Sequence, residues 1–199
     1  MYEGEYSNGK RNGKGKEYNK EGKLIYEGWL FMGKRWEGKG IIEKGLLIFE
    51  GEYRNGQLNG KGKEYNKEGQ LIFDGEYKDG KRNGKGKKYK DGQLIFEGNY
   101  KSGKANGYIR KYNEGILIFE GNYSNGLKDG IAKEYNYLGN LMFKGEYKVG
   151  KRYNGKIYNN KGELESELKE GDGKIKEYDY IRFEQNQNIR KNMSFLLFF

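Results

Sequence analysis

The chain repeats one phrase of 23 to 24 residues along most of its length. Residues 49–72 read FEGEYRNGQLNGKGKEYNKEGQLI, and residues 73–95 follow as FDGEYKDGKRNGKGKKYKDGQLI. The seven copies open at Tyr2, Tyr26, Phe49, Phe73, Phe96, Phe119 and Phe143. Self-similarity at such a period is typical of arrays in which each unit packs only on its neighbours. A motif that recurs in every copy is therefore interpreted first as part of the scaffold.

The composition supports an extended array. Only 34% of the residues are apolar and the mean hydropathy is −1.14, yet 16% are aromatic and 19 are tyrosines. Because the aromatic residues recur at fixed places, we expect an ordered chain. So little apolar material cannot enclose the thick core of a compact 199-residue domain, which favours units stacked in a row.

Each copy predicts two strands. An opening aromatic, a glycine and a second aromatic or large residue stand two positions apart, as in Phe49, Gly51 and Tyr53, so they share one face of a strand. An Asn-Gly pair such as Asn55-Gly56 and a further glycine then predict a hairpin loop of moderate length. A second strand ends at Tyr65, and a polar turn returns the chain to the next opening aromatic. The pattern predicts an all-β, elongated, single-layer antiparallel meander of about seven hairpins and fourteen strands. The hairpin register stays open, because a slip of one residue decides whether Tyr65 shares the face of Tyr53.

Enzymatic and metal-binding functions are disfavoured. The chain has no cysteine and no histidine, which removes disulfides, thiol nucleophiles and the commonest general base and metal ligand. Paired acids such as Glu50 and Glu52 recur in several copies, so no single copy stands out as catalytic. We expect no cofactor, no metal and no small-molecule substrate. Without a leader peptide or an apolar run long enough to cross a bilayer, we expect a cytoplasmic protein, with peripheral membrane attachment as an option.

Two sets of side chains are candidates for binding. The first set is the second aromatic of each copy, because a one-layer sheet would leave these rings partly uncovered and tyrosine favours interfaces. Packing of the rings on one another is the competing interpretation. The residues of this predicted partner-binding set are Tyr53, Tyr77, Tyr100, Tyr123 and Tyr147.

The second set is basic. A formal net charge of +10 and a Lys-Arg pair in several hairpin loops predict one basic edge that could meet an anionic surface. Lysines that only protect the edge of the sheet are the competing interpretation. Nucleic acid is disfavoured as a partner, and GKRNGKGKK at residues 80–88 lacks the helix and the terminal hydroxyl of a phosphate loop. The predicted residues are Lys10, Arg11, Lys34, Arg35, Lys81, Arg82, Lys85, Lys87, Lys151 and Arg152.

Residues 2–15, YEGEYSNGKRNGKG, and residues 49–62, FEGEYRNGQLNGKG, resemble MORN repeats, and this resemblance covers residues 2–164. Residues 66–77 are closest to the variant form of the repeat, some of whose members are described as antitoxin-like. The resemblance implies a non-enzymatic β-sheet used for protein contacts, with phospholipid binding proposed for some members.

We therefore divide the chain into a repeat array, 1–165, and a degenerate repeat with a C-terminal cap or tail, 166–199, which includes a short segment with helical spacing. The preferred function is an interaction scaffold that binds another protein along the sheet. The alternatives are attachment to anionic membrane through the basic loops and an antitoxin-like partnership with a toxin.

Overall fold

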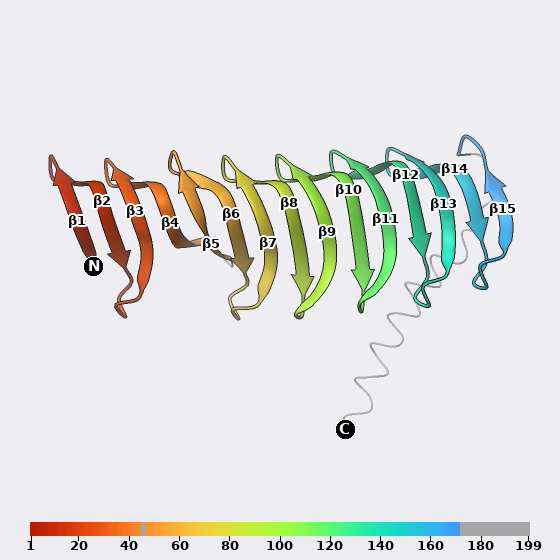
Figure 1. Cartoon of the computed structure of the whole chain (residues 1–199), viewed down its shortest axis with the longest axis horizontal. Helices are drawn as coiled ribbons and strands as arrows, with labels where there is room; N and C mark the ends of the chain where they lie inside the picture. The colour runs from red at the N-terminus through yellow and green to blue at the C-terminus, as the bar shows by residue number, and fades with distance from the viewer. Residues whose placement is uncertain (45–46, 172–199) are drawn as a thin grey trace, which may run out of the picture.

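The chain folds into one antiparallel sheet of fifteen strands that follow one another in chain order (Figure 1). The structure is a computed structural model that describes residues 1–44 and 47–171. The expected meander of hairpins is confirmed, and the described residues contain no helix. The predicted cap or tail lies outside the described residues from residue 172 onward, as does the segment with helical spacing.

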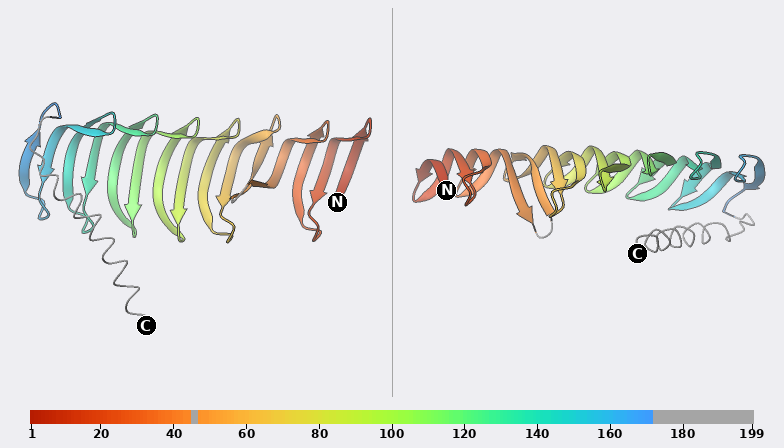
Figure 2. Two further views of the ribbon diagram at one scale, coloured as in Figure 1. Left: turned by 180° about the vertical axis from the view of Figure 1, so that it is seen from behind. Right: turned by 90° about the horizontal axis from the view of Figure 1, so that it is seen from below.

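Short connections join consecutive strands alternately at one edge of the sheet and at the other. The sheet therefore extends along one axis, as Figure 2 shows from behind and from below. Their bounds are β1 (Tyr2–Ser7), β2 (Lys10–Tyr18), β3 (Leu24–Phe31), β4 (Lys34–Lys44), β5 (Leu47–Arg54), β6 (Gln57–Tyr65), β7 (Leu71–Lys78), β8 (Lys81–Lys90), β9 (Gln93–Lys101), β10 (Lys104–Asn113), β11 (Ile116–Ser124), β12 (Leu127–Tyr135), β13 (Leu141–Lys148), β14 (Lys151–Tyr158) and β15 (Leu164–Leu168). In the described part of the chain, no helix is long and apolar enough to cross a membrane.

The hairpin loops are tighter than the sequence suggests. Asn55 and Gly56 have φ values of 51° and 74°, which is the pair of positive angles that a two-residue type I′ turn requires. The further glycine, Gly60, lies inside β6 with φ 107°, where three residues of β6 stand opposite one residue of β5. The expected loop of moderate length is therefore a two-residue turn followed by a large bulge.

Glycines beside the bulge make room for rings. A Cβ atom at Gly86 would lie 2.5 Å from Cζ of Phe73, so the ring of the opening aromatic occupies the space above the neighbouring strand. Where a later copy replaces this glycine, the side chain fills the same space: Ile109 is 0% and Ala132 is 2% exposed. The core is thus a single row of rings and small side chains along one face of the sheet.

One strand continues the sheet past the seven copies. β15 forms from residues in which the repeat pattern has decayed, because pairing with β14 through the backbone needs no consensus side chain. Leu168 pairs with Gly155 as Tyr147 pairs with Gly130, and it is 2% exposed. A single leucine therefore replaces the second aromatic of an eighth unit.

Candidate binding faces

One face of the sheet, here called the aromatic face, holds the opening aromatics and the second aromatics of the repeats. Phe73 packs edge-on against Tyr77 and Tyr100, with ring centroids 5.7 and 5.4 Å apart. The predicted partner-binding tyrosines all lie on this face and are only 4–8% exposed: Tyr53, Tyr77, Tyr100, Tyr123 and Tyr147. These rings form the core of the array, so little of their surface is open to a partner.

The register places Glu64, and not Tyr65, on the aromatic face. Glu64 pairs directly with Phe49 and with Phe73, and directly paired residues point to the same side of a sheet. Tyr65 points to the opposite side, where its hydroxyl donates to Glu50 Oε2 at 3.2 Å. The question that the sequence left open is settled by this pairing.

Glu64 is 3% exposed and accepts three hydrogen bonds. Arg82 donates to both carboxylate oxygens, at 2.7 Å from Nε and 2.6 Å from its terminal nitrogen, and the hydroxyl of Tyr77 donates at 2.5 Å. The guanidinium of Arg82 also lies 4.1 Å from the centroid of the Phe73 ring. Burial and the neighbouring carboxylate of Glu64 raise the pKa of Tyr77, so its hydroxyl stays protonated and keeps donating.

The same ion pair recurs between other units. Glu17 accepts from Arg35 at 2.7 Å, and Glu134 pairs with Arg152 and with Lys128. Burial alone would raise the pKa of Glu134, but the charges of Arg152 and Lys128 lower it to about 2. The pairs with Arg35 and Arg152 join one copy of the repeat to the next and so tie consecutive hairpins together, whereas Lys128 belongs to the same copy as Glu134.

The predicted basic set is divided among three places. The lysines beside the turns are exposed at the hairpin edge, namely Lys10, Lys34, Lys81 and Lys151. The arginines that follow them turn onto the aromatic face and pair with acids or cover rings, namely Arg11, Arg35, Arg82 and Arg152. Lys85 and Lys87 lie on the opposite face. The structure therefore does not gather the ten residues into one basic surface.

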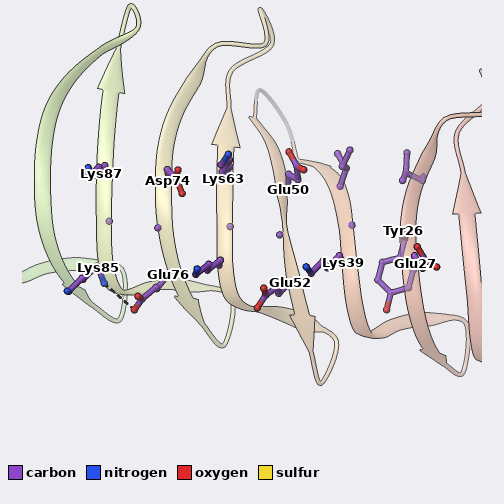
Figure 3. Close-up of a pocket in the computed structure, with 18 of the residues that line it drawn as sticks. Tyr26, Glu27, Lys39, Glu50, Glu52, Lys63, Asp74, Glu76, Lys85 and Lys87 are labelled. Atoms are coloured by element: carbon purple, nitrogen blue, oxygen red, sulfur yellow. Dashed lines mark hydrogen bonds between the residues drawn. The ribbon is translucent and has the colours of Figure 1, made fainter.

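The opposite face, here called the charged face, alternates acids and bases across neighbouring strands. Asp74 pairs with Lys63 on one side and with Lys87 on the other. An open groove of about 850 Å³ runs over β3 to β8 on this face, between two rows of charged side chains (Figure 3). Its lining has equal numbers of acids (Glu27, Glu50, Glu52, Asp74, Glu76) and bases (Lys39, Lys61, Lys63, Lys85, Lys87). The charges that line the groove therefore balance.

Sequence reasoning missed an exposed apolar cluster at the β3–β4 hairpin, here called the tryptophan patch. Trp29, Phe31, Met32 and Trp36 are 49%, 50%, 63% and 40% exposed. The rings of Phe31 and Trp36 are 5.5 Å apart, and Trp29 points to the charged face, where it pairs with Lys14 and Glu37. The signal was available, because both tryptophans of the chain fall in this one copy of the repeat.

Comparison with protein families gives a match to the model described as MORN repeat, at residues 2–23, 49–70, 73–93, 96–108 and 119–135. Comparison with curated proteins gives no match. The two copies that the family model does not match, 26–48 and 143–162, fold as the same hairpin but have a one-residue bulge at Trp36 and Tyr153. The variant, antitoxin-like form stays a prediction. MORN repeats are a non-enzymatic repeat family that is generally associated with protein or membrane interaction. With these five matches, and with the same hairpin in all seven copies, the chain is a MORN-repeat protein.

Proposed function

We propose that the array is a non-enzymatic scaffold that binds an extended segment of another protein on its charged face. The observation that supports it best is the position of the tryptophan patch on β3 and β4, where Trp29 follows the groove residue Glu27 by two positions on the same face of the sheet. Exposed tryptophans are favoured anchors at protein interfaces, and a groove with balanced acids and bases fits a segment of mixed charge.

The tyrosines of the aromatic face support this function as a rigid frame. Their rings lock each hairpin to the next, so the groove keeps its shape without a second layer of structure. Direct contact between a partner and Tyr53, Tyr77, Tyr100, Tyr123 or Tyr147 stays a prediction, because these side chains are nearly covered by the chain itself.

The test compares three variants as bait for affinity recovery of partners. Trp29→Ala with Phe31→Ala truncates two of the four side chains of the patch, and we expect it to weaken binding of the recovered protein by about 30-fold or more, as for an interface hot spot. Tyr137→Ala with Leu138→Ala removes two equally exposed apolar side chains at a different hairpin connection, and should leave binding unchanged. Equal effects of the two double variants would refute the proposed surface.

Peripheral membrane binding is the second candidate. It is favoured by the hairpin tip, where Phe31 and Met32 are exposed next to Lys34, and by the other exposed edge lysines. A variant with Lys10, Lys34, Lys81 and Lys151 changed to glutamate tests it by co-sedimentation with phosphatidylserine vesicles. The membrane function would replace the protein scaffold if the wild type sediments with the vesicles in a salt-sensitive manner, this variant does not, and affinity recovery yields no protein partner.

A further inference from the structure

Two positions of the repeat correspond to each other across every junction between consecutive copies, and at three junctions an ion pair joins them. The first stands just before the second-strand tyrosine, which is Glu43 in the second copy, and the second stands two residues after the hairpin turn of the next copy. Their residues match from junction to junction: Glu17 with Arg35, Ile42 with Leu58, Glu64 with Arg82, Lys88 with Ala105, Lys111 with Lys128, and Glu134 with Arg152. Acid therefore faces base and apolar faces apolar, except at the two junctions that begin with Lys88 and Lys111.

These two lysines flank Phe96 on the aromatic face, one on each neighbouring strand, because both pair directly with it. Each is half-buried, with its ammonium 5.5 Å from the Phe96 centroid for Lys88 and 5.3 Å from the Tyr123 centroid for Lys111. Among the described residues, neither forms an ion pair, in contrast to Arg82 and Lys128 on the same face. Burial lowers the pKa of both lysines, and the charge of Arg82 lowers that of Lys88 further.

A buried donor at the same place has no acceptor. The hydroxyls of Tyr77 and Tyr147 donate to Glu64 and Glu134, but Tyr100 stands where the glutamate is replaced by Lys88. Tyr100 is 5% exposed, and its hydroxyl has no hydrogen-bond partner among the described residues. Buried polar groups are normally satisfied, so this donor indicates a missing acceptor. The hydroxyl of Tyr53 is also unsatisfied, but the charge near its ring, on Arg35, is already paired with Glu17.

We propose that a glutamate or aspartate side chain of an acidic protein segment binds on the aromatic face between Lys88 and Lys111 and accepts a hydrogen bond from Tyr100. The bound carboxylate supplies the negative charge and the hydrogen-bond acceptor that Glu64 and Glu134 provide at their own junctions. This second site lies on the opposite side of the sheet from the tryptophan patch, so the array would bind two segments, one on each face.

The surroundings favour a carboxylate of a polypeptide over a phosphate of a membrane. The chain's own precedent is a glutamate whose two oxygens are satisfied by a tyrosine hydroxyl and by cations. Lys88 and Lys111 stand near the ends of β8 and β10, away from the edge that holds Lys81 and the other exposed tip lysines. A segment laid across the strands can reach the half-buried lysines from the aromatic face, and the Lys88 side chain, whose ammonium lies 6.0 Å from the Tyr100 ring centroid, has to move aside for the carboxylate to meet the buried hydroxyl.

The test selects binding peptides from a random twelve-residue display library on the immobilised full chain. We expect the selected peptides to be enriched in Asp and Glu. For the best peptide, replacing its acidic residue by the amide should weaken binding to the wild type about tenfold or more, as for a hydrogen-bonded charge. With Lys88→Glu and Lys111→Glu, the same replacement should change binding less than twofold, because the chain then fills its own site.

The matched control is Lys85→Glu with Lys87→Glu, which makes the same change of charge on the other face of β8. Circular dichroism first verifies the fold of each variant. Loss of the acid dependence in the control as well would show a general charge effect and overturn the site. Selected peptides without enrichment in Asp and Glu, or an empty selection, would also overturn the site between Lys88 and Lys111. Loss of partner binding only with Trp29→Ala and Phe31→Ala would leave the first proposed surface, on the charged face, intact. If the wild type binds phosphatidylserine vesicles, Lys88→Glu with Lys111→Glu abolishes this binding, and no peptide shows an acid dependence, the ligand of the site is a lipid and not an acidic segment.

Discussion

Arg82→Leu is expected to lower the free energy of unfolding by about 3 to 5 kcal/mol, because it removes the main partner of a buried carboxylate. Glu64 is 3% exposed and loses two of its three hydrogen bonds in this variant. Only the hydroxyl of Tyr77 then remains to satisfy the charge.

Glu64→Ile should cost less, about 1 to 3 kcal/mol. Arg82 is about one quarter exposed, at 24%, so its guanidinium can turn toward water when the acid is removed. The remaining cost is the buried hydroxyl of Tyr77, which loses its acceptor. The chain already contains this arrangement, because Ile42 and Leu58 occupy the same two positions and the hydroxyl of Tyr53 is left unsatisfied beside them.

The double variant Glu64→Ile with Arg82→Leu therefore should be more stable than Arg82→Leu alone, which is the decisive comparison. Replacement of a buried ion pair by apolar residues is often neutral, whereas removal of one partner is not. Urea unfolding followed by circular dichroism measures all three variants, with Lys81→Leu as an exposed control expected within about 0.5 kcal/mol of the wild type. A double variant whose loss equals the sum of the single losses would refute the coupling between the two side chains.

Three further results are expected. The pKa of Glu134 is lowered from 4.5 to about 2, so its contribution to stability, about 3 kcal/mol, is complete above pH 4.5 and is lost as the pH falls toward 2. Glu134→Gln should therefore flatten the dependence of the free energy of unfolding on pH in this range, as measured by urea unfolding at each pH. Gly86→Ala should destabilise by about 1 to 3 kcal/mol through the clash with Phe73, and should cost clearly less in a Phe73→Leu background; equal costs in both would show that the ring is not what excludes the methyl group. Lys88→Glu should raise the thermal midpoint by about 2 to 4 °C by giving Tyr100 an acceptor, and a lowered midpoint would contradict the match between the two junction positions.

The sequence by itself determined the architecture, because the signals that specify it are local. The Asn-Gly pairs set the turns, and the spacing of two between Phe49, Gly51 and Tyr53 places these residues on one face. The position at which Gly86 makes room for a ring also follows from comparing the copies, because Ile109 and Ala132 replace this glycine later in the chain. Each of these inferences needs no knowledge of which strand lies beside which, beyond the order of the chain.

The tertiary structure decided what each face presents. In the bulge, three residues of β6 stand opposite one residue of β5, and the length of the loop in the sequence does not reveal this number. The register therefore follows only from the paired strands, which show that Glu64 and not Tyr65 faces the rings. The arginines of the Lys-Arg pairs looked like surface charge, yet Arg82 turns inward because its acid, Glu64, stands 18 residues earlier in the previous copy. Burial and charge pairing depend on such contacts between copies. The sequence therefore predicts the order and pairing of the strands, whereas the packed sheet is needed to show that Lys88 and Lys111 form no ion pair among the described residues.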